Sequence, residues 1–244
     1  MQKKHVNKKN IITILVIFVL MPATLVVSWY FGNRKYYLSS VLIMIYAMIP
    51  FFAGFERRRP EARDIVTLAV MSAIAAASRV AFMPLPHFKP LVGITMISGM
   101  AFGPQAGFLT GAISGLVSNF VFGQGPWTPW QMFAYGIAGF IGAWFFRIGI
   151  FNVNRRFRTA IISFLVVLCI IGPILDTCAV FTMAGEIDMK ILPTIYMSGV
   201  PVNAVHGIAT ALTLFFLGEP MMEKLDRIKV KYGMMDTEVK NEVR

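Results

Sequence analysis

Long apolar segments constrain the fold of this 244-residue chain more than any other feature of its sequence. A helix needs about 17 to 25 mainly apolar residues to cross the roughly 30 Å hydrocarbon core of a bilayer. Backbone groups inside that core must be hydrogen-bonded within the protein, and the segments lack the alternation typical of a membrane β-barrel. We therefore predict eight membrane-spanning helices, near residues 11–31, 38–55, 64–82, 91–103, 106–122, 130–147, 159–181 and 194–217.

The composition agrees with this interpretation. The chain is 57% hydrophobic and only 14% charged, and its mean hydropathy is +0.67. These values lie far outside the range of soluble domains. The predicted fold class is therefore all-α, a polytopic membrane helical bundle.

The distribution of basic residues predicts the orientation of the bundle. The formal net charge is +11, from 23 Lys and Arg against 12 Asp and Glu. If both termini are cytoplasmic, 18 basic residues lie inside, in four segments (before residue 11, at 57–63, at 147–158 and after 223), and four lie outside. This bias follows the positive-inside rule. We expect a multi-pass protein of the bacterial cell membrane with both termini cytoplasmic, attracted to anionic membrane lipid and binding no nucleic acid.

Three regions follow one another along the chain. Residues 1–60 are predicted to form an N-terminal transmembrane hairpin and a basic linker. Residues 61–220 hold six helices and nearly all the polar and glycine-rich features, so we expect this region to be the substrate-binding core. Residues 221–244 are charged and are expected to form a cytoplasmic tail.

Two helices of the core carry stripes of small residues at four-residue spacing, which lets helix backbones approach closely in lipid. The first stripe comprises Ala69, Ala73 and Ala77. It is compatible with packing inside this protein or with a docking face for another membrane subunit. The second comprises Gly103, Gly107, Gly111 and Gly115. It follows a tight re-entry at Pro104, so we expect it to pack within the bundle.

The segment from Gln124 to Gln131 is a charge-free turn between two apolar segments, with two Trp and two Gln residues. It contains no titratable group, so it is unsuited to acid–base or metal chemistry. It is well suited to hold a large polar ligand at a membrane face. The turn therefore predicts ligand capture, with no catalytic residue, no metal site and no cofactor.

Polar residues within membrane spans are energetically expensive and mark candidate functional sites. On the predicted topology, several of them lie with aromatic residues in the outer half of the bundle, as expected of a mostly apolar pocket with a few placed polar groups. The predicted substrate-binding residues are Phe82, His87, Asn119, Gln124, Trp127, Trp130, Gln131, Tyr135, Asp176 and Asn203. Two alternatives remain open: Arg79 and Asp176 form a structural ion pair, and Trp127 and Trp130 belong to an interfacial aromatic belt.

From about residue 62 to 220 the chain resembles the S components of energy-coupling factor (ECF) vitamin transporters. The resemblance lies in the six core helices, the alanine stripe and two stretches, FGPQAG (102–107) and NFVFGQGPWTPWQ (119–131). The second stretch is similar to S components linked to cobalamin and related corrinoids. The extra hairpin at residues 1–55 departs from the six-helix pattern of the family.

This resemblance implies that the protein binds a vitamin from outside and docks on a membrane T component driven by two cytoplasmic ATPases. In the family the alanine-rich face makes that contact, which maps here to Ala69, Ala73 and Ala77. The chain has no Walker A motif of its own, so ATP would be hydrolysed by its partners.

An enzyme of a different class is the alternative. Ser114 and His206 resemble the dyad of rhomboid-like intramembrane serine proteases, which needs the nucleophile and base within hydrogen-bond reach. The match is poor because Ala112 stands where the rhomboid motif has glycine.

Overall fold

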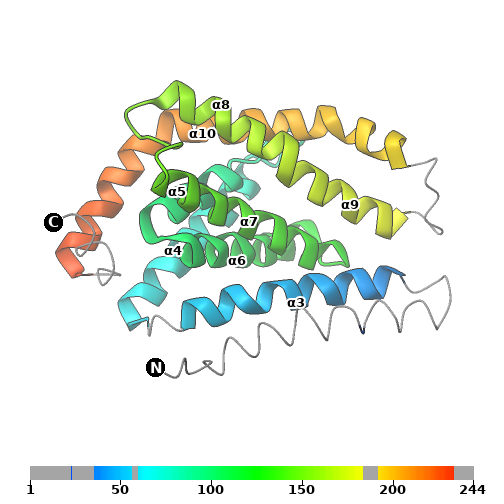
Figure 1. Ribbon diagram of the computed structural model, residues 1–244, viewed down its shortest axis with the longest axis horizontal. Coiled ribbons are helices and arrows are strands. Elements are labelled where there is room, and N and C mark those ends of the chain that lie inside the picture. The colour runs from blue at the N-terminus through cyan, green and yellow to red at the C-terminus, as the bar shows by residue number, and fades with distance from the viewer. Residues whose placement is uncertain (1–22, 24–35, 57–59, 184–191, 234–244) are drawn as a thin grey trace, which may run out of the picture.

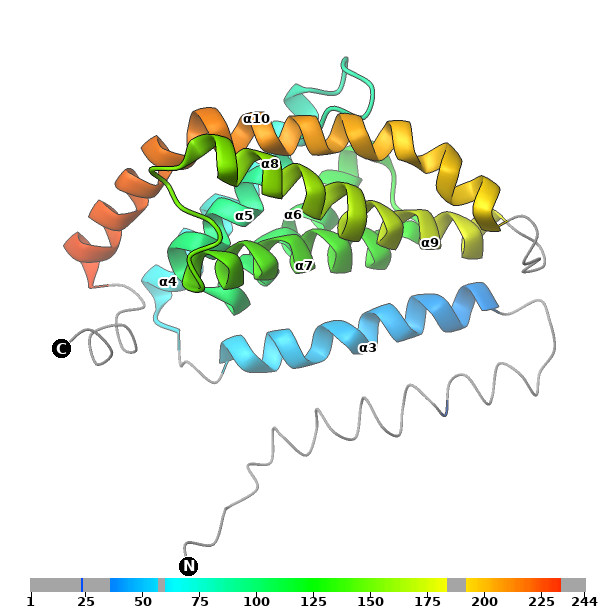
Figure 2. The same cartoon turned by 45° about the horizontal axis from the view of Figure 1, so that its top comes forward.

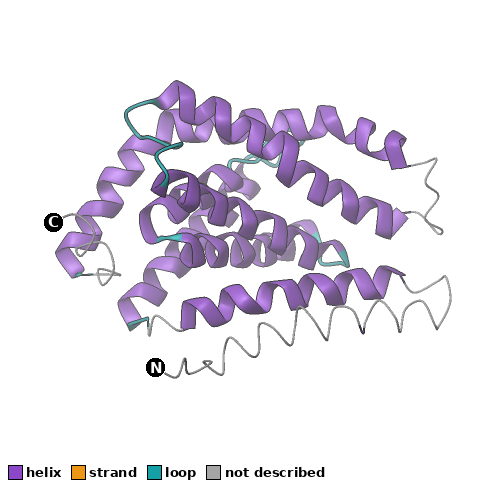
Figure 3. Cartoon of the chain, in the orientation of Figure 1, coloured by secondary structure: helices purple, strands orange, loops and turns teal. Residues whose placement is uncertain are grey.

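The computed structural model describes residues 23, 36–56, 60–183 and 192–233, and all regular structure in these ranges is helical (Figures 1 and 3). The helices are α3 (Tyr36–Glu56), α4 (Ala62–Ala81), α5 (Leu91–Phe102), α6 (Pro104–Phe122), α7 (Trp127–Arg147), α8 (Arg156–Val166), α9 (Gly172–Met183) and α10 (Leu192–Tyr232). A π-helical turn, η2 (Val167–Ile171), joins α8 to α9 without a break. The all-α bundle predicted from the sequence is confirmed, while the span predicted at 11–31 lies outside the described residues except for residue 23.

Five helical segments of the described chain are long and apolar enough to cross a membrane: Ser39–Glu56, Ala62–Ala81, Pro104–Phe122, Arg156–Phe181 and Leu192–Tyr232. Leu91–Phe102 is apolar but shorter, as the sequence predicted. Helix α7 has 21 residues but is less apolar, because the Trp-Thr-Pro-Trp-Gln segment and several glycines lower its hydropathy. It lies at the centre of the bundle, where it packs against α3, α5, α6 and α9.

Local sequence signals set several helix boundaries. A capping box begins α4, because Asp64 accepts a hydrogen bond from the backbone N–H of Glu61 while the Glu61 side chain caps the first turn. Helix α6 begins with Pro104 and is bounded by Gly103 and Gly123, whose φ angles are 94° and 96°. Glycine adopts this backbone conformation readily, whereas a residue with a side chain rarely does.

A glycine interface, formed by Gly99, Gly107, Gly111 and Gly139, brings α5, α6 and α7 into backbone contact. A Cβ atom added at Gly107 would lie 2.5 Å from the Gly99 Cα and 2.6 Å from the Gly139 carbonyl oxygen. A Cβ at Gly111 would likewise lie 2.6 Å from the backbone nitrogen of Gly136. The sequence prediction that the glycine stripe packs within the bundle is therefore confirmed at these positions.

Helix α3 lies along the outside of the core and contacts α6, α7 and α9 (Figure 2). Phe51 makes the principal aromatic contacts. Its ring stacks on Phe108 at a centroid distance of 3.9 Å and meets Phe140 edge-on at 5.5 Å. The part of the predicted hairpin that the structure describes is therefore packed against the six-helix core.

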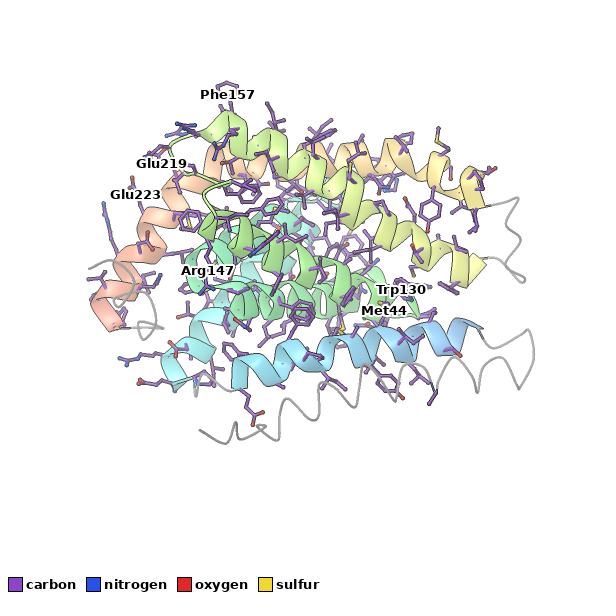
Figure 4. The ribbon with its side chains drawn as sticks, in the orientation of Figure 1. Met44, Trp130, Arg147, Phe157, Glu219 and Glu223 are labelled. Atoms are coloured by element: carbon purple, nitrogen blue, oxygen red, sulfur yellow. The ribbon has the colours of Figure 1, made fainter. Side chains whose placement is uncertain are left out.

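The two ends of the bundle differ in charge. Figure 4 places Arg147, Glu219 and Glu223 at one end of the bundle and Trp130 toward the other. At the first end, Lys229 donates to the Ala101 carbonyl at 2.8 Å. Arg156 pairs with Glu219, and Arg63 donates to the Tyr232 carbonyl. The described basic segments thus share one end, which we call the basic end, and Trp130 marks the opposite end.

Helix α10 continues through residue 220, where the sequence analysis placed the boundary between core and tail. It contains Pro201 and Pro220 and bends over its C-terminal part (Figure 1). Met222 and Leu225 remain buried beyond this point. The described part of the predicted tail therefore packs onto the bundle as a helical extension.

Candidate substrate-binding site

A chain of hydrogen bonds links the end of α4 to the turn between α6 and α7. Arg79 Nη1 donates to Ser118 Oγ at 2.7 Å and to Asn119 Oδ1 at 2.8 Å. Asn119 Nδ2 donates to Thr128 Oγ1 at 3.1 Å, and that hydroxyl donates to Gln124 Oε1 at 2.9 Å. Each side-chain amide in this series of hydrogen bonds is bonded through both its oxygen and its nitrogen. The turn is therefore fixed in position against α4.

The turn itself is built from its own side chains. Thr128 Oγ1 accepts the backbone N–H of Gly125 at 3.2 Å, which satisfies a donor just before α7. The Trp127 indole N–H donates to the Gly123 carbonyl at 3.3 Å, and its side chain is 41% exposed. Trp127 therefore lies at the rim of the turn, where an indole also suits a membrane interface.

Arg79 is the buried cation of this end of the bundle, with only 4% of its surface exposed. Its guanidinium carbon lies 4.4 Å from the centre of the Phe122 ring and 5.9 Å from that of Tyr135. Cation–π contacts of this kind stabilise a guanidinium that has lost water. Arg79 therefore joins α4, α6 and α7 through neutral partners.

A second polar cluster lies between α9 and α10. Asn203 Nδ2 donates to Asp176 Oδ2 at 2.7 Å, and the hydroxyls of Thr177 and Tyr196 are 2.8 Å apart. In the described chain Asp176 pairs with Asn203 and Arg79 with Ser118 and Asn119, so the ion pair considered between Arg79 and Asp176 does not form.

Small residues make room for this second cluster. A Cβ added at Gly199 would lie 2.5 Å from the Asp176 carboxylate oxygens, and one at Gly172 would lie 2.5 Å from Asn203 Nδ2. Gly172 follows directly on the π-helical turn η2. Such turns occur often at functional sites.

Aromatic contacts join α7 to α9 and α10, the helices that carry the second cluster. Trp130 is 4% exposed and stacks on Phe181 of α9 at a centroid distance of 5.8 Å. Tyr135, which faces Arg79, also meets the ring of His206 on α10 edge-on at 6.1 Å. The candidate site is therefore built from aromatic and polar side chains of α4, α6, α7, α9 and α10.

Unpaired polar atoms are concentrated in this region. Buried polar atoms are nearly always hydrogen-bonded, so exceptions need an explanation. Six buried side-chain N or O atoms of the described residues have no partner, and four of them belong to this region: Arg79 Nε, Trp130 Nε1, Gln131 Oε1 and His206 Nε2. Three donors or donor–acceptors and one acceptor are thus available to a bound molecule.

The structure brings most of the sequence-predicted residues together. The hydrogen-bonded and aromatic contacts include Asn119, Gln124, Trp130, Tyr135, Asp176 and Asn203. Gln131 is half-buried on α7. Phe82 is 39% exposed and packs on Phe88 at 5.3 Å, in the connection between α4 and α5.

His87 lies apart from the buried contacts. It is exposed, and its φ of 61° places it in the left-handed region, unlike the other described residues that carry a side chain. This conformation occurs at tight turns. The position suits a residue at the entrance of the site better than one at its centre.

Five residues of the region were absent from the predicted set: Arg79, Ser118, Thr128, Phe181 and His206. Arg79 and His206 were visible as polar residues within apolar segments, but they were assigned to an ion pair and to the protease alternative. Ser118 and Thr128 carry no sequence signal that separates them from other hydroxyl residues of membrane helices. Only their contacts with Arg79 and Asn119 reveal their position.

Two surface hollows of the described chain lie elsewhere. One, of about 430 Å³, is lined by apolar residues of α3 together with Glu56 and by Met132 of α7. The other, of about 460 Å³, lies at the basic end and is lined by residues 154–158 and Phe215. Neither contains a residue of the predicted site.

The protease alternative lacks its required geometry. The Ser114 hydroxyl is fully buried and donates to the Gly111 carbonyl at 2.9 Å. His206 Nε2 has no hydrogen-bond partner. A serine and histidine that are not hydrogen-bonded to each other do not form an activated nucleophile.

Comparisons with known proteins agree with the transporter interpretation. A relative from Clostridium perfringens strain SM101, described as a UPF0397 protein, is 28% identical over 197 residues, which are 75% of this chain and 99% of the relative. A second UPF0397 protein, from strain ATCC 13124, is 27% identical over 165 residues, which are 64% of this chain and 82% of the relative. No solved structure matches.

A family model described as the S component of the ECF-type riboflavin transporter matches residues 60–223, two thirds of the chain and the whole of the predicted core. S components are subunits of transporters, so the protein is not an enzyme. The corrinoid-linked subset that the sequence suggested is not supported by this match. The chain belongs to the ECF-type riboflavin transporter S-component family.

Proposed function

We propose that this protein is the substrate-capture subunit of an ECF-type importer of the bacterial cell membrane, which binds a vitamin at the end of the bundle opposite the basic end. The observation that carries the proposal is the group of buried, unpaired polar atoms on Arg79, Trp130 and His206. A bound ligand is the simplest source of partners for them. Membership of the S-component family supplies the same interpretation independently.

Each side chain of the site has a role that its contacts suggest. Trp130 and Tyr135 offer flat apolar area to a ring system, while Trp130 Nε1 remains free to donate. Gln131 Oε1 accepts from an N–H group of the ligand. Asn119 and Asn203 hold Arg79 and Asp176 in place and contact the ligand at the edges of the site.

Two vitamins deserve the first tests. Riboflavin is the ligand named in the description of the matched family, and its planar ring has carbonyl and imide groups that complement donors and an acceptor. Cobalamin, or a related corrinoid, is the ligand indicated by the 119–131 stretch. We rank riboflavin first, because the model of that family matches the whole of the predicted core.

Delivery requires partners, and family membership implies a T component and ATPases. Ala69, Ala73 and Ala77 are exposed on α4, and Val66 and Val70 beside them are 62% and 51% exposed. A flat apolar face of small residues that no other described helix covers is suited to close contact with another membrane helix. We propose this face as the docking surface, with both termini of the chain cytoplasmic.

Binding by the detergent-purified full chain tests the proposal. Calorimetry with riboflavin and cobalamin should give saturable binding of one of them, and Trp130→Ala should weaken it by about 30-fold or more, as for an aromatic anchor. Trp144→Ala is the matched control, because Trp144 belongs to the same helix, lies near the basic end and is 51% exposed. Gln131→Ala serves as a second variant if Trp130→Ala unfolds.

A protein that binds neither these nor other vitamins, while its thermal unfolding shows that it is folded, would contradict the proposed function. Equal loss of binding in the Trp144 and Trp130 variants would place the site elsewhere. Binding of cobalamin and not riboflavin would reverse our ranking of ligands and leave the capture function intact.

A further inference from the structure

The guanidinium of Arg79 has one free edge. Nη1 makes both hydrogen bonds of the group, to Ser118 and Asn119. Phe122 lies against a face of the guanidinium, 4.4 Å away. Nε has no partner, and no hydrogen bond of Nη2 exists within the described chain. The Nε–Nη2 edge therefore presents two parallel N–H groups that no described residue accepts.

This edge has a defined chemical preference. Two parallel N–H donors of a guanidinium match the two oxygens of a carboxylate or phosphate, and such paired bonds are stronger and more directional than single neutral ones. The partners that Arg79 already has are neutral: a hydroxyl, an amide oxygen and two aromatic rings. Its positive charge is therefore hydrogen-bonded but not neutralised by any described side chain.

The charged residues around the site also indicate an anionic partner for Arg79. Among the described residues, Asp176 is the only acid away from the basic end, and its carboxylate is engaged by Asn203. The basic groups that act electrostatically on the buried His206 include Lys89 as well as Arg79. A cation that is 4% exposed within a membrane bundle is expensive unless it is paired. An anion brought by the ligand would supply the missing pair.

We infer that the ligand carries an anionic group, a carboxylate or a phosphate, which binds side-on to Nε and Nη2 of Arg79. This inference rests on the proposed function and narrows the class of substrate. His206 Nε2, whose ring contacts Tyr135, is a further unpaired atom that the same ligand could reach. Riboflavin, the first ligand to be tested, carries no such group, so the inference favours a phosphorylated flavin or another anionic vitamin over riboflavin itself.

Inorganic phosphate and acetate are the probes for the test, because they do not depend on which vitamin is bound. The thermal unfolding of the full chain in detergent is followed as each salt replaces chloride at constant ionic strength. We expect the Tm to rise and to saturate with one of the two anions, which distinguishes phosphate from carboxylate recognition. Arg79→Gln should abolish this rise.

Arg147→Gln is the matched control, since Arg147 is exposed at the basic end, and it should respond to the anion as the parent does. General stabilisation by excluded salts would grow without saturation and equally in all variants. If Arg79→Gln does not fold, Arg79→Lys decides, because lysine keeps the charge and loses the paired donors. Its half-saturating concentration should be about tenfold higher or more. A parent that shows no saturable rise, or an equal response in Arg79→Gln or Arg79→Lys, would overturn the inference.

Matched ligand pairs separate this inference from the proposed function. Riboflavin against its 5′-phosphate, and cobinamide against cobalamin, differ by a phosphate-bearing group. Tighter binding of the phosphorylated member, lost in Arg79→Gln, supports both proposals. Equal binding of both members by the parent and by Arg79→Gln overturns the anionic subsite and leaves vitamin capture standing. A saturable anion response with no vitamin bound supports the subsite and contradicts the vitamin.

Discussion

The glycine interface permits a stability test with a magnitude that the structure sets. At Gly107 the nearest atoms to an added Cβ are backbone atoms of two other helices, at 2.5 Å on Gly99 and 2.6 Å on Gly139. Carbon atoms in contact prefer separations of about 3.5 to 4.0 Å, so Gly107→Ala requires α6 to move by about 1 Å. No flexible side chain is present at these contacts to relieve the overlap.

Two opposing effects decide the size of the change. Replacing glycine by alanine within a helix stabilises it by about 0.5 to 1 kcal/mol, because alanine loses less backbone entropy. Overpacking a close contact costs about 1 to 3 kcal/mol or more. Because both clashes are with backbone, we expect the upper part of that range and a net loss of about 2 kcal/mol for Gly107→Ala.

Gly218→Ala is the matched control. Gly218 also lies within a helix, α10, but an added Cβ would meet no atom within 4 Å. The helix-propensity gain therefore acts alone there, and the free energy of unfolding should rise by about 0.5 to 1 kcal/mol. Unfolding of both purified variants in the same detergent, by heat or denaturant, measures the difference. A Gly107→Ala protein at least as stable as Gly218→Ala would refute the proposed backbone contact of α5, α6 and α7.

Two further predictions concern the docking face and the polar pair of α9 and α10. Ala73→Trp places a large side chain on the exposed face of α4, so it should prevent copurification with a T component and ATPases. Vitamin affinity should stay within about twofold, because Ala73 makes no contact in the site. Unchanged copurification would argue against this docking face. Asn203→Ala removes the donor to Asp176 and should lower stability by about 1 kcal/mol, as expected when a partly buried group loses a hydrogen bond. An unchanged free energy of unfolding would show that the stability of the bundle does not depend on this bond.

Most of the helix boundaries could be predicted because the signals are local. The predicted spans 64–82, 106–122 and 159–181 correspond to α4, α6 and the continuous α8–α9 helix, with boundaries within a few residues. Each is determined by apolar length and by neighbouring proline, glycine or basic residues. The π-helical turn inside the last of these has no comparable signal, since it arises where tertiary contacts shift the hydrogen-bond register of an otherwise regular helix.

Identifying the candidate site depended on the tertiary structure more than identifying the helices did. The sequence by itself identified polar and aromatic residues in membrane segments, among them Asn119, Trp130 and Asp176, because such residues are rare in lipid whatever the fold. It did not determine their partners. Arg79 and Asp176 have opposite charges and similar predicted depth, yet the packing of α6 against α4 gives Arg79 to Asn119. The packing of α10 against α9 gives Asp176 to Asn203. Helix packing therefore decides which charge is left without a counter-charge, and hence which ligand the site favours. The physical reason is that pairing depends on distances of a few ångströms between residues far apart in the sequence.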